Sequence, residues 1–285
     1  MNFSSSLAEV LHAAEPLISA AIAEDIGRED ATSRSILPAN ARAKAMILVK
    51  AEGIMAGLPV AKAVFLRVNP KIDFLPVVND GSRMKPMTAC AYLEGPALGI
   101  LSAERIALNF LQHLSGIATL TSAYVQAVAG TSTVILDTRK TTPGYRLLEK
   151  YAVRLGGGQN HRLGLFDMLL VKDNHIQAAG SISLAVRRAR ESHPALTLEV
   201  EVTSLQQLEE AISLSVDRIM LDNMDMETIR KAIKITARRI PLEVSGGVTL
   251  ENVREFAATG VDFISVGALT HSAPALDISL EISAH

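Results

Sequence analysis

The first third of the chain mixes helical and strand-like patterns of apolar residues. Apolar side chains recur at helical spacing over residues 6–24, which predicts an amphipathic helix. Residues 42–50 alternate between apolar and polar side chains as a half-buried strand does, and residues 72–78 form a second candidate strand. Between them, residues 59–68 predict a helix with Pro59 at a permitted early position. Strands and helices do not alternate regularly here, which favours an α+β unit.

Two consecutive helices are predicted in the segment that follows. Ser102 is a suitable N-cap for a helix that runs to about Leu114. The apolar pattern then continues over residues 117–129, so we expect a second helix after Gly116.

From residue 134 onwards, strand-like apolar runs alternate with helical segments. The runs end about every 20 to 35 residues, close to the roughly 30 residues of each unit in a (β/α)8 barrel. Six units are visible, so a barrel built from them is either incomplete or includes strands that this pattern does not locate. A doubly wound open sheet is the alternative, but its Gly-x-Gly-x-x-Gly signature is missing. The predicted strand ends are Asp137, Lys172, Val202, Asp222, Ser245 and Gly267.

Helix start and stop signals support this division. Ser204 and Gln207 have the spacing of a capping box. Thr249 is expected to cap the next helix, and Gly260 occupies a plausible position just beyond its end.

Composition narrows the functional classes. The chain has 285 residues, 48% of them hydrophobic and 20% charged, so it can build a substantial core. A net charge of −2 argues against a general nucleic-acid binder. The apolar stretch 7–23 is too short and too polar for a membrane span, and the first basic residue is Arg28, so we expect a cytoplasmic protein without membrane partners. The single cysteine, Cys90, is expected to be a buried structural thiol.

Cations follow several of the predicted barrel strands. The carboxyl ends of the strands in a parallel barrel meet at one mouth, where active sites form. Arg139 and Lys140 follow the first strand, His161 and Arg162 follow a run of glycines, and Lys172 ends its own strand. A pair of adjacent cations alone is typical of a solvated loop. Four cations and a histidine at one mouth would repel one another, so this set favours an anionic ligand, which arginine binds in a bidentate manner.

Two carboxylates are predicted at the same mouth. Glu201 and Asp222 lie at the ends of two strands and could be ion-pair partners of Arg139 or Lys172. Alternatively, they could bind Mg²⁺ together with a phosphorylated substrate, because Mg²⁺ prefers hard oxygen ligands and few protein carboxylates. Glu199 shares a strand face with Glu201, but Glu201 is nearer the carboxyl end and is therefore preferred.

Glycine-containing turns follow the last two strands and are candidates for phosphate binding. Glycines at these positions leave backbone N–H groups accessible, and late barrel turns often hold a phosphate. Glycine also serves ordinary turns, so each turn alone is a weak signal. The residues concerned are Ser245, Gly246, Gly247, Val266, Gly267 and Ala268.

Arg105 is unusual because it falls in the first turn of the helix expected to begin at Ser102. A positive charge there opposes the helix dipole. Either it pairs with Glu104 or a neighbour, or it reaches a separate anion, which could lie in another subunit.

Several of these segments together resemble the quinolinate phosphoribosyltransferase family. The similarity runs from about residue 24 to the C-terminus. It includes Asp-Thr-Arg-Lys-Thr at 137–141, Asn-His-Arg at 160–162, Lys-Asp-Asn-His at 172–175 and Ser-Gly-Gly at 245–247. The other matching segments are 101–119, 151–158, 199–202, 221–223 and 266–271.

The resemblance implies an N-terminal open-faced α/β sandwich domain over residues 1–115, joined by the C-terminal tail 271–285. It also implies an incomplete α/β (TIM-like) barrel domain over residues 116–270. It also implies a homodimer or a hexamer of dimers, with sites between subunits. Arg105 would reach into the site of the partner.

The resemblance also assigns the site residues. The pocket for quinolinate would be lined by Arg139, Lys140, His161, Arg162 and Lys172, and Thr138 would also bind substrate. Glu201 and Asp222 would serve the ribose and the Mg²⁺-diphosphate of phosphoribosyl pyrophosphate (PRPP), and the late glycine turns would take its 5′-phosphate. The residues expected to be catalytic are Lys140, Lys172, Glu201 and Asp222.

The implied reaction joins quinolinate to PRPP and yields nicotinate mononucleotide, pyrophosphate and CO2, a step of NAD synthesis. Three alternatives stay open. The chain could be the molybdenum-associated paralogue of the family, a Schiff-base aldolase using Lys172, or a noncatalytic anion-binding oligomer.

Overall fold

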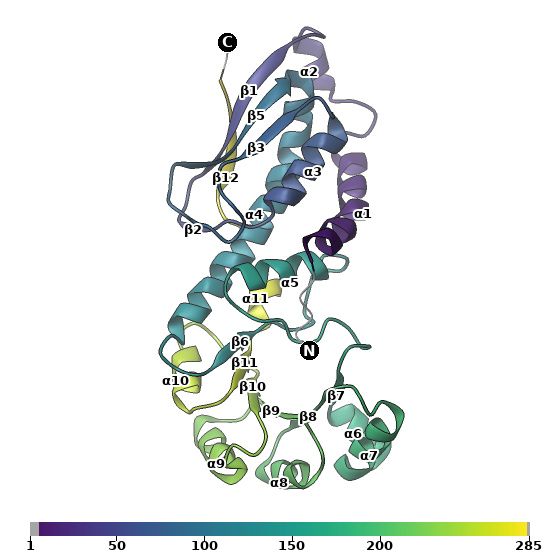
Figure 1. Ribbon diagram of the computed structural model, residues 1–285, viewed down its shortest axis with the longest axis vertical. Helices are drawn as coiled ribbons and strands as arrows, with labels where there is room; N and C mark the ends of the chain where they lie inside the picture. Colours follow the sequence, from purple (N-terminus) through teal and green to yellow (C-terminus); the bar gives the residue numbers. More distant parts are fainter. Residues whose placement is uncertain (1–5, 284–285) are drawn as a thin grey trace. The chain divides into compact units, whose positions relative to one another are not determined.

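The structure, a computed structural model, describes residues 6–283, except for the side chain of Ser283. Residues 1–5 and 284–285, which the predicted sandwich domain includes, lie outside the described residues. The described chain forms two compact units (Figure 1). The sandwich unit comprises residues 6–122, 141–157 and 269–283, and the barrel unit comprises residues 123–140 and 158–268. This grouping divides the chain after residue 122 and assigns residues 141–157 to the sandwich unit.

An antiparallel four-stranded sheet forms the centre of the sandwich unit. Its order is β12-β1-β5-β3, so the C-terminal strand pairs with the first strand of the chain. Side chains on one face, such as Ala43, Ala45 and Ile47, are buried, whereas Lys44 and Tyr92 belong to an open face. The predicted open-faced sandwich is therefore confirmed. The strands are β1 (Arg42–Val49), β3 (Asp73–Pro76), β5 (Thr88–Pro96) and β12 (Ile278–Ser283), and a small second sheet pairs β2 (Gly53–Ile54) with β4 (Arg83–Met84).

Helices complete the sandwich unit, and several match the sequence-based expectations. The helix predicted over residues 6–24 is α1, which Ser6 and Glu9 cap reciprocally. The helix predicted over residues 59–68 is α3, with proline in its first turn. The helices are α1 (Leu7–Asp25), α2 (Ala31–Ile36), α3 (Leu58–Val68), α5 (Arg146–Leu155) and the short α11 (Ala268–His271). No helix within residues 6–283 is both long and apolar enough to cross a membrane.

The two helices predicted between residues 102 and 129 are in fact one helix, α4 (Ala97–Ala127). Ser102 does not cap it, because α4 begins five residues earlier, at Ala97. Its hydroxyl group donates instead to Asp30 Oδ2 at 2.9 Å. Gly116 does not break it either: a Cβ atom there would lie 2.1 Å from the carbonyl oxygen of Pro274. Glycine therefore permits a close approach of two segments. Arg105 lies well inside α4, so the argument from the helix dipole was wrong.

A parallel six-stranded sheet forms the barrel unit, with the order β6-β11-β10-β9-β8-β7. The predicted incomplete α/β barrel is confirmed, and each expected strand end falls within two residues of an observed one. The strands are β6 (Val134–Leu136), β7 (Leu169–Val171), β8 (Leu198–Val202), β9 (Arg218–Asp222), β10 (Leu242–Ser245) and β11 (Phe263–Ser265). Helices lie along the outside of this sheet (Figure 1): α6 (Asp173–Ala179), α7 (Ile182–Ser192), α8 (Leu205–Ser213), α9 (Met226–Thr236) and α10 (Val253–Ala258).

The helix caps of the barrel unit agree in part with the predictions. Ser204 caps α8 by accepting from the N–H of Gln207, but the side chain of Gln207 bonds to Thr203 rather than returning to Ser204. Thr249 does not cap α10, which begins after Asn252. The α10 helix ends as predicted, with Gly260 in the left-handed region just beyond its C-cap.

The strand register aligns the carboxyl ends. Ser245 is paired with Asp222 on one side and with Ser265 on the other, and Ser265 is paired with Leu136. An isolated parallel bridge between Leu136 and Gln159 brings one more chain segment beside β6. Residues that follow these strands therefore gather along one edge of the sheet.

We predict that Cys90 will resist alkylation in the folded protein. Its side chain is buried, and burial raises the pKa of the thiol to about 12, so almost no thiolate forms at pH 8. Labelling with iodoacetamide at pH 8, followed by intact-mass measurement, should show no adduct while the protein unfolded in guanidinium reacts fully. Equal rates in the two states would contradict this.

Candidate functional site at the carboxyl ends of the barrel strands

All predicted site residues except Arg105 belong to the barrel unit. Thr138, Arg139 and Lys140 lie in the loop after β6, beginning two residues beyond its end. The hydroxyl of Thr138 accepts from the N–H of Lys140 at 3.0 Å. Lys172 directly follows β7. Arg105 lies on α4 in the sandwich unit, with an exposed side chain.

Arg162 brings a guanidinium group into a buried position near these strand ends. Its Nη1 atom donates to the carbonyl oxygen of Met168 at 3.2 Å. Burial, and then repulsion by the charge of Arg139, lower the pKa of Arg162. The two guanidinium groups are therefore close enough to repel each other, which fits a site that binds an anion.

Lys172 forms an ion pair with Glu201 across neighbouring strands β7 and β8. The lysine side chain is 41% exposed, whereas that of Glu201 is 9% exposed. The N–H of Lys172 also donates to Nδ1 of His175 at 3.0 Å, and α6 begins at the next residue. The ion-pair interpretation of Glu201 is thus correct, with Lys172 as the partner.

Asp222 is held by the residue that follows it. The side-chain amide of Asn223 donates to Asp222 Oδ2 at 2.9 Å, and the N–H of Asn223 donates to the carbonyl oxygen of Ser245 at 2.9 Å. Asn223 has a φ of 51°, a left-handed conformation that asparagine tolerates better than most residues. Its amide occupies the space beside Gly246, where a Cβ atom would lie 2.1 Å from Asn223 Oδ1.

The two late turns differ in what they offer a ligand. Gly246 and Gly247 both have positive φ values, 94° and 62°, so the turn after β10 depends on glycine. Val266 is buried, and its N–H donates to the carbonyl oxygen of Leu136 at 2.9 Å. That N–H group is part of the sheet rather than a donor for a phosphate. Gly267 and Ala268 follow it and lead into α11.

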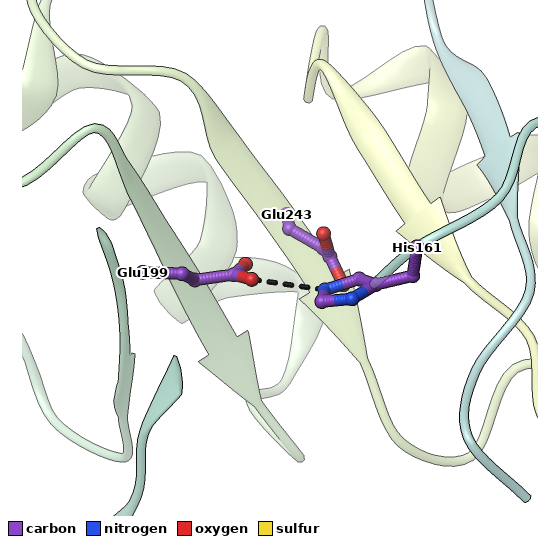
Figure 2. A group of neighbouring side chains, drawn as sticks. All are labelled: His161, Glu199 and Glu243. Atoms are coloured by element: carbon purple, nitrogen blue, oxygen red, sulfur yellow. Dashed lines mark hydrogen bonds and ion pairs between the residues drawn. The ribbon is translucent and has the colours of Figure 1, made fainter. Parts of the chain in front are cut away.

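A buried ionic network includes His161 and reaches the strands β8 and β10 through Glu199 and Glu243 (Figure 2). Glu199 Oε2 lies 2.9 Å and Glu243 Oε1 3.5 Å from His161 Nε2. Glu243 Oε2 also accepts from Arg218 Nη1 at 2.9 Å, and the hydroxyl of Ser265 donates to Glu243 Oε1. Burial raises the pKa of Glu199 to about 7. Burial, and then the charge of Glu199, raise the pKa of Glu243 to about 7.

Sequence reasoning selected His161 from this network but missed Glu243 and Arg218, and it set Glu199 aside. A usable signal was present, because Glu199 and Glu243 each stand inside an apolar strand, and glutamate is rarely fully buried without partners. The identity of those partners depends on which strands are neighbours, and the order β10-β9-β8 is not readable from spacing.

Two groups of residues have donor atoms suited to a metal ion. Glu201 and Asp222 offer carboxylate oxygens at strand ends, the kind of ligand that Mg²⁺ prefers. Since Glu201 is paired with Lys172, these two residues alone would supply only part of the coordination of such an ion. His161, Glu199 and Glu243 also have potential ligand atoms within 4.8 Å of one another.

We predict that Gly246→Ala will destabilise the protein more than Gly247→Ala. Both changes put a Cβ atom on a residue with positive φ, at a cost of about 1–2 kcal/mol. Only the Cβ atom at position 246 collides with Asn223, whereas the one at position 247 meets no atom within 4 Å. In chemical denaturation, the free energy of unfolding should be about 1 kcal/mol lower for Gly246→Ala than for Gly247→Ala. Equal losses would contradict the close contact with Asn223.

Comparisons with known proteins agree over nearly the whole chain. The family model for the quinolinate phosphoribosyl transferase N-terminal domain matches residues 30–115, and that for the C-terminal domain matches residues 117–281. A probable nicotinate-nucleotide pyrophosphorylase (carboxylating) of Synechocystis is 46% identical over 272 residues, which cover 94% of this chain and 92% of the relative. The corresponding protein of Bacillus subtilis is 46% identical over 261 residues, covering 91% and 90%.

Solved structures give the same result. NadC from Streptococcus pyogenes superposes with a TM-score of 0.93 at 41% identity, covering 98% of this chain and 99% of that chain. The nicotinate-nucleotide pyrophosphorylase from Francisella tularensis has a TM-score of 0.93 at 40% identity, covering 96% and 97%. With both domain models matched in order, and with close relatives of nearly equal length, this chain belongs to the quinolinate phosphoribosyltransferase family.

Proposed function

We propose that this protein transfers the phosphoribosyl group of PRPP to quinolinate and releases pyrophosphate and CO2. The product is nicotinate mononucleotide, an intermediate of NAD synthesis. The observation that carries the proposal is that Arg139 lies close to Arg162, and Lys172 is paired with Glu201 at the strand ends, in a chain of this family. A pyridine dicarboxylate supplies the negative charge that such cations require.

The cations give each anionic group of quinolinate a partner. Arginine binds a carboxylate with two parallel hydrogen bonds, which fixes the orientation of the ring. Arg139, Arg162 and the ammonium group of Lys172 are the donors we assign to the two carboxylates. Lys140, in the loop after β6, is a further candidate. Orientation matters because the pyridine nitrogen must face the anomeric carbon of PRPP, and positioning of this kind lowers the barrier substantially.

We assign the protein carboxylates Glu201 and Asp222 to the second substrate, PRPP. Breaking the bond between the anomeric carbon and the pyrophosphate oxygen leaves positive character on the ribose, which Glu201 and Asp222 can stabilise electrostatically. Mg²⁺, carried by the diphosphate, would neutralise the departing charge. The pyridine nitrogen forms the new bond to carbon and becomes cationic.

Loss of CO2 follows from that cationic ring. The bond between the ring and the adjacent carboxylate breaks, its electron pair stays on the ring carbon, and a proton then replaces CO2 there. The positive ring nitrogen acts as the electron sink, so the protein has to supply the proton and hold the ring. Lys140 and Lys172 are the candidate donors.

The alternatives fit less well. An aldolase that uses Lys172 requires a free amine, whereas Lys172 is engaged in an ion pair with Glu201. The relatives described above bear the name of the pyrophosphorylase, which favours quinolinate over the substrate of the molybdenum-associated paralogue.

We further propose that the protein acts in the cytoplasm as a homodimer in which each site receives Arg105 from the partner. Two observations support a shared site: Arg105 is exposed, and it belongs to a different compact unit from the other predicted site residues. The direct test of function is to incubate the protein with quinolinate, PRPP and Mg²⁺ and to follow the release of CO2 and the formation of nicotinate mononucleotide.

We predict that Arg139→Ala will nearly abolish activity. Leaving one charge of a desolvated pair without its partner costs about 3–5 kcal/mol, roughly a hundredfold to a few thousandfold in kcat/KM for quinolinate. Arg187→Ala is the matched control, because Arg187 is exposed on the outer helix α7. Steady-state kinetics of the purified variants provide the measurement. Normal kinetics in the Arg139 variant would refute its assignment to the pocket.

We also predict that two inactive variants will complement each other. A mixed dimer of Arg105→Ala and Lys172→Ala chains would contain one site with both changes and one site with neither. Random mixing should then restore roughly a quarter of the wild-type activity. The chains should be unfolded and refolded together, and mixed dimers verified by affinity tags of two kinds. Absence of recovered activity in verified mixed dimers would rule out the shared site.

A further inference from the structure

The buried network around His161 gives its imidazole ring a single orientation. Nδ1 accepts a hydrogen bond from the N–H of Arg162 at 2.7 Å, so Nδ1 carries no proton. The ring proton is therefore on Nε2, which faces Glu199 Oε2 at 2.9 Å and Glu243 Oε1 at 3.5 Å (Figure 2). Both ring nitrogens thus have partners within the protein, which gives the ring a different role from direct binding of a substrate carboxylate.

A metal ion explains this cluster poorly, although the three side chains could in principle ligate one. Both oxygens of Glu243 have partners already, the guanidinium group of Arg218 on one and the hydroxyl of Ser265 on the other. Arg218 is also stacked on the ring of Phe263, with its guanidinium carbon 4.1 Å from the ring centroid. A divalent ion would have to displace or approach a fixed positive charge.

The segment that carries His161 is anchored on its other side as well. Asp137, at the end of β6, accepts from the N–H of His161 at 2.8 Å and from the side-chain amide of Asn160 at 2.6 Å. The imidazole therefore joins two parts of the structure: the carboxylates on β8 and β10, and the main chain at Arg162. The orientation of the Arg162 backbone depends on the ring, and that of the ring depends on the carboxylates.

From this geometry we propose that Glu199 and Glu243 are positioning residues for quinolinate binding, which act by locking the His161 ring so that it holds Arg162 in place. The proposal rests on the function given above. Glu199 is the stronger contact and Glu243 the weaker, because their distances to Nε2 differ by more than half an ångström. Arg162 then presents its guanidinium group to a substrate carboxylate from a fixed main chain. Bidentate binding requires such alignment, and a misplacement of about 1 Å can cost up to a hundredfold.

The test compares an apolar and a polar replacement of the same residue. Glu199→Leu removes the nearer of the two acceptors for Nε2, whereas Glu199→Gln keeps an acceptor oxygen at this position. Both leave Glu243 and Arg218 as a neutral pair, so neither creates an uncompensated buried charge. We expect the KM for quinolinate to rise about tenfold to a hundredfold in the leucine variant and less than about threefold in the glutamine variant. The KM for PRPP should stay within about twofold in both.

A matched control separates positioning from general stability. Thr133 is buried just before β6, and its hydroxyl donates to the carbonyl oxygen of Val261 at 2.7 Å. Thr133→Val removes this bond from the same unit without touching His161, and it should leave both KM values unchanged. In ¹⁵N-histidine spectra, the Nε2–H resonance of His161 should persist in Glu199→Gln and be lost or shifted upfield in Glu199→Leu.

The possible outcomes are distinct. If the wild-type protein does not use quinolinate, the proposed function itself fails. If it does, an unchanged KM for quinolinate in Glu199→Leu, or an equal rise in both KM values, overturns the positioning role. Should the leucine variant not fold, Glu199→Met takes its place, because the flexible methionine side chain tolerates an imperfect cavity. Failure of both to fold would also overturn the proposal, since the carboxylate would then serve folding alone.

Discussion

The parallel register of six strands is the constraint on which the site depends. Because Asp222, Ser245, Ser265 and Leu136 stand side by side, groups that follow these positions gather along one edge of the sheet. Side chains alternate along a strand, so Glu199 and Glu201 point to the same face at different depths. Glu201 meets Lys172 at the exposed end, and Glu199 meets His161 in the interior. A single geometric rule therefore positions both the predicted ligand contacts and the residues beneath them.

Charge balance is the second requirement of this arrangement. The positive charge of Arg139 repels that of Arg162 and lowers its pKa. A bound anion would relieve this repulsion. In the interior, two glutamates are accommodated by Arg218, His161 and a hydroxyl group. Buried ionic groups of this kind contribute little to stability in general. Their role here is therefore better explained by fixing the position of a binding group than by a gain in stability.

Much of the fold could be predicted from local patterns. Apolar runs bounded by helical segments located all six strands of the barrel unit, and the polar residues at their ends became the candidate site. The prediction failed where the role of a residue depends on a partner that is distant in the sequence. Gly116 reads as a helix break, but its role is to let α4 approach Pro274. In the sequence, Arg218 is an ordinary residue at the start of a strand and Glu243 an isolated acid. Their ion pair can be predicted only when β9 and β10 are known to be neighbours.

The pairing of β12 with β1 affects how the protein can fold while it is being synthesised. One hydrogen-bonding edge of strand β1 is filled by residues 278–283, which are synthesised after the whole barrel segment. Until then, that edge of the sheet presents unpaired backbone groups, the feature that makes exposed strands prone to pair with other chains. The sandwich unit can therefore be completed only after the barrel segment has been synthesised.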